Sequence, residues 1–206
     1  MVHVDVTDGH VVPEVSFGLP VVESIRKATD LTLDVHLLIE RPERFVRDFI
    51  AAGADRVAIH PETTADLYGV IRLIRSGGAI AGVALRPAVP LDVVTDVLAD
   101  LDFLNILSAD PGEAEENYIP HSTFKLRSAA ALRDRRGGQF SLQLEGGIDR
   151  ARVHEIINAG ANILVVGAAC FGQTDPGGRL KDLFLGVSEA TGEIERAESH
   201  LGSHEV

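Results

Sequence analysis

The chain has 206 residues, of which 45% are hydrophobic, and this size suits one compact domain with a substantial core. Its formal net charge of −12 argues against nucleic acid or an anionic membrane surface as a partner. Cys170 is the single cysteine, so no internal disulfide can form. The sequence shows no secretory signal and no apolar run of the roughly 20 residues that a membrane helix needs. We therefore expect a cytoplasmic globular protein.

Short β-branched runs alternate with helical patterns about every 25 residues, a spacing typical of repeated βα units. Strands are predicted over 2–6, 33–38, 56–60, 80–85, 102–107, 140–145 and 162–166. Helices are predicted near 19–29, 42–52, 65–76, 91–99, 122–135, 149–159 and 178–190. We expect one domain over 1–190 and an acidic C-terminal tail over 191–206.

Seven βα units are compatible with an open doubly wound sheet or with a (β/α)8 barrel, which requires eight. Strands covered by helices on both faces should be apolar throughout. Here three strands carry polar residues at alternate positions: His3 and Asp5, Asp34 and His36, and Ser141, Gln143 and Glu145. These polar residues gather toward the strand C-termini, where barrel enzymes place their chemistry. The pattern predicts the α/β class and a (β/α)8 TIM barrel.

Two imidazoles and two carboxylates stand at or near strand ends: His3, Asp5, His36 and Glu145. Such a donor set suits one divalent ion, Zn²⁺, Fe²⁺, Mn²⁺ or Co²⁺, rather than a soft thiolate site. A metal-free cluster of hydrogen-bonded side chains is the alternative. Buried Asp and His are uncommon unless paired, and four of them facing one interior are hard to explain as packing. We therefore predict a metal site.

Five segments carry a family resemblance in order along nearly all of residues 2–172: HVDVTDGHVVPEVSFGLPVVESIRK, LDVHLLIERPERF, AGADRVAIHPE, GVALRPAVPLD and GGIDRARVHEIINAGANILVVGAACFG. The chain resembles the ribulose-phosphate 3-epimerase family and its pentulose- and hexulose-phosphate relatives, to which the H-x-D-x-x-D-G-H-x-V-P block is specific. The family fold is a (β/α)8 barrel. The resemblance implies that the family's metal ligands fall on His3, Asp5, His36 and Glu145.

The resemblance also implies an activity, a metal-dependent 3-epimerase that interconverts ketose phosphates. D-ribulose 5-phosphate and D-xylulose 5-phosphate are the leading pair, and allulose 6-phosphate is the nearest variant. A proton leaves the carbon beside a ketone only if the resulting enediolate is stabilised, which a divalent ion does. Epimerisation then needs one carboxyl group on each face, and Asp5 and Glu145 would fill these roles.

A small phosphorylated sugar is the expected partner, and the protein is expected to form a homo-oligomer. The residues expected to contact the sugar phosphate are His36, Gly146, Gly147, Gly167 and Ala168. His60, at the end of the third strand, is a further candidate for a substrate contact.

Two departures from the family pattern concern the chemistry of the site. Glu145 stands where the family has Asp, and its carboxylate reaches about 1 Å further, a misplacement that can cost on the order of 100-fold in rate. The loop after the fifth strand carries Glu113, Glu115 and Glu116 where the family has a glycine-rich segment. These carboxylates would repel a phosphate unless they point to solvent.

Other departures affect the pocket wall and the start of the barrel. Ala168 replaces a serine that contacts phosphate in the family, and methionines of the family's metal pocket are Thr7, Leu38 and Leu107 here. The family begins with a strand and helix before the H-x-D strand, where this chain has only Met1. A catalytically degenerate barrel, which binds a small anion or assembles with a partner, therefore stays open as a second hypothesis.

A decarboxylase or aldolase of the same barrel group is a third interpretation. Those relatives use an Asp-x-Lys-x-x-Asp strand, whereas the chain reads HVDVTDG at the matching position and has no lysine there. The sequence disfavours this interpretation.

Overall fold

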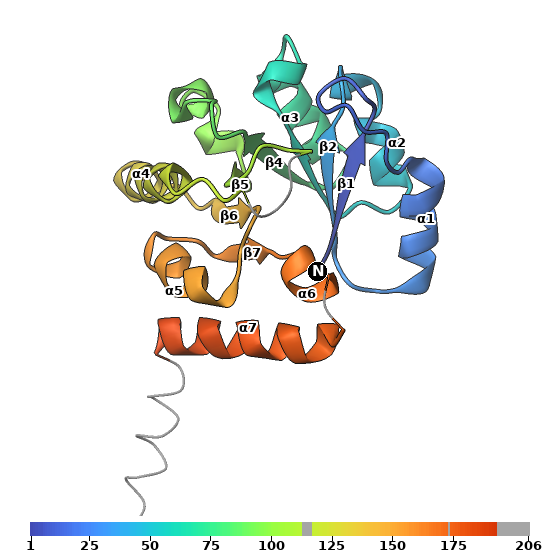
Figure 1. Cartoon of the computed structure of the whole chain (residues 1–206). Coiled ribbons are helices and arrows are strands. Elements are labelled where there is room, and N and C mark those ends of the chain that lie inside the picture. The colour runs from blue at the N-terminus through green and yellow to red at the C-terminus, as the bar shows by residue number, and fades with distance from the viewer. Residues whose placement is uncertain (113–116, 173, 193–206) are drawn as a thin grey trace, which may run out of the picture.

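The computed structural model describes residues 1–112, 117–172 and 174–192. The acidic segment 113–116 and most of the predicted tail therefore lie outside the described residues. Seven parallel strands form one sheet in chain order, from β1 to β7 (Figure 1). The strands are β1 (Val2–Thr7), β2 (Leu33–Leu38), β3 (Arg56–Ile59), β4 (Ile80–Leu85), β5 (Phe103–Leu107), β6 (Ser141–Glu145) and β7 (Ile163–Val165).

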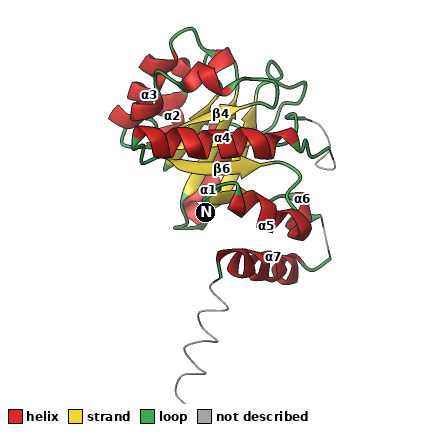
Figure 2. Cartoon of the chain, turned by 90° about the vertical axis from the view of Figure 1, so that its left-hand side faces the viewer, coloured by secondary structure: helices red, strands yellow, loops and turns green. Residues whose placement is uncertain are grey.

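Helices connect the strands and cover the outside of the sheet (Figures 1 and 2). They are α1 (Leu19–Ala28), α2 (Val46–Ala51), α3 (Leu67–Ser76), α4 (His121–Arg136), α5 (Arg150–Asn158), α6 (Ala168–Phe171) and α7 (Pro176–Thr191). Aspartates begin three of them, because Asp66, Asp149 and Asp175 each accept a hydrogen bond from a backbone N–H of the first turn. No helix in these described ranges is long and apolar enough to cross a membrane.

The helix predicted over 91–99 is wrong. Two short 3₁₀ turns, Leu91–Val94 and Leu98–Asp100, stand in its place. The segment is rich in β-branched residues, including Val93 and Thr95, whose side chains lose rotamer freedom in an α-helix. The predicted helix over 42–52 likewise starts as a 3₁₀ turn, Pro42–Arg44.

Alternate residues of each strand face two different cores. On β2 all six residues are buried: Leu33, Val35 and Leu37 belong to the main core, whereas Asp34 and His36 face the inside of the sheet. The inner apolar residues form a separate small cluster of Ala58, Ala84, Phe103 and Leu107. Helices thus cover one face, and the other face encloses polar side chains.

The curvature of the sheet decides between a flat sheet and a barrel. Five strand steps separate β1 from β6, which at about 4.8 Å each would place them about 24 Å apart in a flat sheet. Yet Glu145 on β6 lies 3.4 Å from His3 on β1, measured from Oε2 to Nε2. The sheet therefore curls into the TIM-barrel-like fold that the polar pattern predicts.

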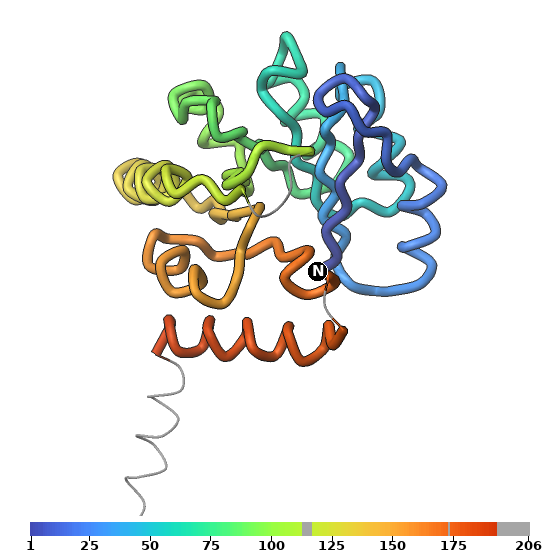
Figure 3. The backbone as a smooth tube through the Cα atoms, viewed as in Figure 1, coloured from blue at the N-terminus to red at the C-terminus, as the bar shows by residue number. Residues whose placement is uncertain are grey.

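The curled sheet is open between β1 and β7, which are its two edge strands in the described chain. Figure 3 traces the path from the blue strand β1 at one edge to the orange β7 at the other. The three residues of β7 are only half-buried, whereas every residue of β2, β3 and β5 is buried. This arrangement fits a barrel that contains seven of its eight strands, as predicted.

Candidate metal centre

The first two strands bring three of the predicted ligands together through their register. Asp5 pairs with His36 across the β1–β2 ladder, and His3 precedes Asp5 by two residues on the same face. The curvature of the sheet brings the fourth ligand, Glu145 of β6, close to His3 and His36. One ligand atom from each of these four residues lies within 4.8 Å of every other, so the structure assembles the complete predicted set.

Oxygen and nitrogen atoms of the four side chains face one another at short range. Oδ1 of Asp5 lies 2.8 Å from Nδ1 of His36 and 3.3 Å from Nε2 of His3. Oε2 of Glu145 lies 3.4 Å from each of the same two nitrogens. Asn105 donates a further hydrogen bond of 2.5 Å to this Glu145 oxygen. The two carboxylates thus converge on the two imidazoles.

Charges within this cluster shift the acidities of all four side chains. Burial opposes protonation of both histidines, but the charge of Glu145 and the hydrogen bonds to neighbouring carboxylates together outweigh it, and they raise the pKa of His36 to about 9 and that of His3 well above its usual value. Burial also opposes ionisation of Glu145, yet the neighbouring His36 and His3 hold its pKa well below its ordinary range. Hydrogen bonds from both histidines lower the pKa of Asp5, against burial and the charge of Glu145. The cluster is arranged to hold positive charge between two carboxylates.

The ring nitrogens fit a divalent ion at this centre. Nε2 of His3 is buried without a hydrogen-bond partner and faces the two carboxylates. The opposite nitrogen of each ring is occupied: Nδ1 of His3 lies 2.8 Å from Asp34, and Nε2 of His36 lies 2.8 Å from His60. Ligand histidines are usually held in this way through their second nitrogen. Two imidazoles and two carboxylates suit the ions predicted from the sequence.

A second polar layer lies beneath the cluster, toward the strand N-termini. Asp34 accepts hydrogen bonds of 3.0 Å from both Arg56 and Gln143, and Arg56 also donates to the Gln143 carbonyl at 3.0 Å. The Arg56 guanidinium carbon lies 4.0 Å from the centre of the Phe103 ring. Gly82 makes room for that ring, because a Cβ there would lie 2.2 Å from it. Burial opposes ionisation of Asp34, yet the hydrogen bond that it accepts from His3 and the charges of His3 and Arg56 hold its pKa at about 2.

The sequence predicts no role for Arg56, Asn105 or Asp34, and it predicts His60 only as a candidate for a substrate contact. Arg56 and His60 share a strand face with Ala58, so the alternation that singled out His3 and Asp5 was also present in the third strand. His60 is fully buried against His36.

The predicted sugar-phosphate contacts other than His36 lie beyond the ends of β6 and β7. The register pairs Glu145 with Val165, which places Gly147 and Gly167 at the same end of neighbouring strands. Gly146 has φ +106°, and a Cβ on it would lie 2.9 Å from the backbone nitrogen of Ala109. Ala168 begins α6. Their role in binding stays a prediction.

Buried side chains occupy the positions where the resemblance expects methionines. Leu107 belongs to the inner apolar cluster, and Leu38 is buried at the end of β2. The hydroxyl of Thr7 is buried and lacks a hydrogen-bond partner.

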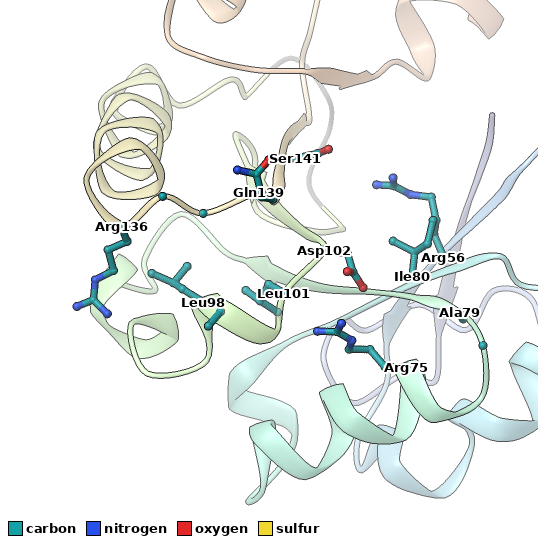
Figure 4. A pocket seen from close by; sticks show the side chains of 14 residues that line it. Arg56, Arg75, Ala79, Ile80, Leu98, Leu101, Asp102, Arg136, Gln139 and Ser141 are labelled. Atoms are coloured by element: carbon teal, nitrogen blue, oxygen red, sulfur yellow. The ribbon is translucent and has the colours of Figure 1, made fainter.

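A cavity of about 740 Å³ lies at the opposite end of the sheet from the ion cluster (Figure 4). Its lining includes Arg56, Ile80 and Ser141, the first residues of β3, β4 and β6, together with Asp102 just before β5. Barrel enzymes carry their active sites at the carboxyl ends of the strands. We therefore locate the candidate site at the His3 and Glu145 cluster and not in this cavity.

Comparison with known proteins shows the family to which the chain belongs. The model of the ribulose-phosphate 3-epimerase family matches residues 1–171. The chain belongs to this family. It is 38% identical to ribulose-phosphate 3-epimerase of Bacillus subtilis over 84% of its own length and 81% of that protein. It is 41% identical to the chloroplastic ribulose-5-phosphate-3-epimerase of Arabidopsis thaliana, over 84% of the chain and 63% of that protein.

Solved structures support the fold of this ribulose-phosphate 3-epimerase family member. A 3-hexulose-6-phosphate synthase superposes with a TM-score of 0.64 at 19% identity, covering 90% of this chain and 86% of the other. The thiamine phosphate pyrophosphorylase of Pyrococcus furiosus gives a TM-score of 0.61 at 18% identity, with 91% and 96% covered. At these identities the likeness bears on the fold alone.

Proposed function

We propose that this protein is a metal-dependent 3-epimerase of ketose phosphates. One observation carries the proposal: two histidines and two carboxylates from strands β1, β2 and β6 converge within 4.8 Å. A divalent ion bound there would supply Lewis-acid stabilisation of the negative charge that develops on the substrate oxygens. His3, His36, Asp5 and Glu145 would hold it.

Asp5 and Glu145 are proposed to move the proton. Each turns one oxygen toward the two histidines, so that its second oxygen can take or return a proton at the substrate carbon. The two carboxylates differ in surroundings, because the Asp5 side chain is 47% exposed on an edge strand and the Glu145 side chain is 15% exposed on an inner strand. Two carboxylates from different strands, β1 and β6, supply the two groups that such a reaction needs, one for each face of a planar intermediate.

D-ribulose 5-phosphate and D-xylulose 5-phosphate are the proposed substrate pair, and allulose 6-phosphate is the nearest alternative. The names of the relatives support the pentulose phosphates. Backbone N–H groups near Gly146, Gly147, Gly167 and Ala168 are proposed to receive the phosphate, since the serine hydroxyl of the family is absent at Ala168.

The test follows the entry of solvent deuterium into D-ribulose 5-phosphate at the epimerised carbon, with ion-loaded protein in D₂O. Glu145→Gln keeps the volume and removes the ionisable carboxyl group, so exchange should fall by about 100-fold or more. Glu145→Asp should fall less, because it keeps the carboxylate but withdraws it from Asn105 and the histidines. Chelation of the ion should abolish exchange in every variant.

Glu155→Gln is the matched control, because it makes the same chemical change on the exposed surface of α5. It should exchange deuterium at the native rate. Full activity in both Glu145 variants would show that Glu145 is a bystander. Absence of exchange in ion-loaded native protein, for each ketose phosphate tried, would reject the epimerase.

The open sheet supports one competing function, a non-catalytic barrel that binds a small anion or assembles with a partner. Its support is the half-buried edge strand β7 together with Glu145 in place of the family's Asp. Metal content separates the two functions, since protein that is purified without stoichiometric transition metal and takes none up would favour this one. Sedimentation of the same samples tests the predicted homo-oligomer.

A further inference from the structure

A second histidine lies directly behind one of the candidate ion ligands. His60 follows β3, its side chain is fully buried, and its Nε2 lies 2.8 Å from Nε2 of His36. The two ring centres are 5.0 Å apart with a tilt of 31°. At this distance one nitrogen must carry a proton and the other a lone pair.

A divalent ion held between the two carboxylates would fix which nitrogen of His36 carries the proton. Nδ1 of His36 faces Asp5 and Glu145, so this nitrogen must present a lone pair to a bound ion. The single proton of a neutral imidazole then sits on Nε2, which donates to Nε2 of His60.

The position of the proton on His60 follows from that on His36. Since its Nε2 accepts, its own proton sits on Nδ1, and this buried nitrogen faces Oε1 of Glu62 at 3.5 Å. Glu62 belongs to the 3₁₀ turn Pro61–Thr63. That turn is held by Thr63, whose backbone N–H and hydroxyl both donate to the His60 carbonyl. The backbone of residue 60 therefore supports the turn, while its side chain meets His36 and Glu62.

We propose that His60, backed by Glu62, is a positioning residue that holds His36 in its Nε2–H tautomer and aims its Nδ1 lone pair at the ion. This inference rests on the proposed function, because it assumes that the cluster binds a divalent ion. The geometry distinguishes it from ordinary packing: a buried apolar residue would fill the same space and leave the Nε2–H of His36 without an acceptor, which costs free energy. Partners of this kind typically change ion affinity by about 10–100-fold when they are removed.

The experiment measures the affinity of metal-free protein for Co²⁺ by competition with a chelator, and the visible spectrum of the Co²⁺ form. His60→Leu removes the acceptor and should weaken Co²⁺ binding by about 10–100-fold with an altered spectrum. His60→Gln places an amide oxygen near the position of the lost nitrogen and should recover most of the affinity. His154→Leu makes the same change on the exposed face of α5 and should bind like the native protein.

A second pair of variants keeps the proposal testable if His60→Leu fails to fold. Glu62 is partly exposed, with 34% of its side chain accessible, so replacing it leaves the core packing in place. Glu62→Met removes the acceptor and should weaken Co²⁺ binding several-fold, whereas Glu62→Gln retains an acceptor and should stay near native. Ring-nitrogen ¹⁵N spectra of the Zn²⁺ form should report the Nε2–H tautomer of His36 in native protein, and the signal of this N–H should shift in His60→Leu because its acceptor is lost.

The outcomes separate this inference from the proposed function. Native Co²⁺ affinity in His60→Leu and Glu62→Met, with an unshifted Nε2–H signal in His60→Leu, would overturn the positioning role and leave the epimerase standing. An Nδ1–H tautomer of His36 in the Zn²⁺ form would overturn it as well. Native protein that binds neither Co²⁺ nor Zn²⁺ would reject the proposed function and this inference together.

Discussion

The inside of the barrel holds two polar layers that differ in how fully their hydrogen bonds are satisfied. In the amino-end layer, Asp34, Arg56 and Gln143 bond to one another, with both oxygens of Asp34 occupied. In the carboxyl-end layer, two carboxylates converge, and Nε2 of His3 is buried without a partner. The first layer is complete within the protein, whereas the second is complete only with an added positive charge.

The same difference is general in TIM barrels, where residues at the amino ends of the strands contribute to stability and residues at the carboxyl ends contribute to catalysis. Asp34 connects the layers, because it accepts from Arg56 below and from Nδ1 of His3 above. A change at Asp34 should therefore affect both layers, and a change at Glu145 only the upper one.

The largest effect is expected from Asp34→Leu, which leaves the guanidinium of Arg56 buried without a carboxylate. Removing one partner of a buried ion pair typically destabilises a protein by about 3–5 kcal/mol. Urea unfolding of the metal-free protein measures this loss. The double change Asp34→Leu with Arg56→Leu should cost less than the sum of the single changes, since it leaves no unpaired charge. A loss below about 1 kcal/mol in Asp34→Leu would contradict the structural role of the lower layer.

An intermediate effect is expected when the upper layer receives its ion. Free Zn²⁺ at 100 times the dissociation constant should raise the free energy of unfolding by about 2.7 kcal/mol, because the ion binds the folded state. The rise in melting temperature should shrink in Glu145→Gln and remain in Glu155→Gln at the same Zn²⁺ concentration. An equal rise in both variants would place the ion elsewhere in the molecule.

The smallest effect is expected from pH in the metal-free protein, through the Asp34 carboxyl group at the acid end of the scale and the His36 imidazole at the alkaline end. The pKa of Asp34 is about 2 in the fold against 3.8 ordinarily, so its contribution is present above pH 3.8 and is lost as pH falls through about 2. This shift corresponds to about 2 kcal/mol. The pKa of His36 is about 9 against 6.5, so its contribution is complete below pH 6.5 and is lost as pH rises through about 9.

Unfolding free energies across this pH range test the assignment. Asp34→Asn should flatten the acid side of the curve, and His36→Gln should flatten the alkaline side. A curve whose alkaline side is unchanged by His36→Gln would contradict the raised pKa of that histidine.

Much of the fold was predictable because strand patterns are local. All seven strands occur where alternation and β-branched runs predicted them, and no strand end differs from its prediction by more than one residue. The helix predicted over 91–99 was wrong because the prediction used only the spacing of apolar residues. That spacing does not report the low helix propensity of the β-branched residues in the segment. The division into a domain over 1–190 and a tail stays a prediction, and α7 itself runs to Thr191.

The candidate ligands were predictable as a set, and their supporting partners were not. His3, Asp5, His36 and Glu145 were visible from strand position, donor chemistry and the family resemblance. Asn105 gave no such signal, since one buried amide on a strand is ordinary until its partner is known. It meets Glu145 because β5 and β6 are neighbours in register, with Leu107 opposite Glu145.

The sequence by itself determined which side chains face inward, because the two-residue period of a strand depends only on the order of residues. Tertiary structure alone decided which of them meet. The curl of the sheet brings Glu145 within 3.4 Å of His3, and the β2–β3 register sets His60 behind His36. Hydrogen bonds and ion ligation require atoms to lie within about 3 Å of each other. The spacing of residues along the chain does not determine such distances between side chains on different strands. The candidate centre therefore follows from the curl of the sheet, and the chemistry of its members from the sequence.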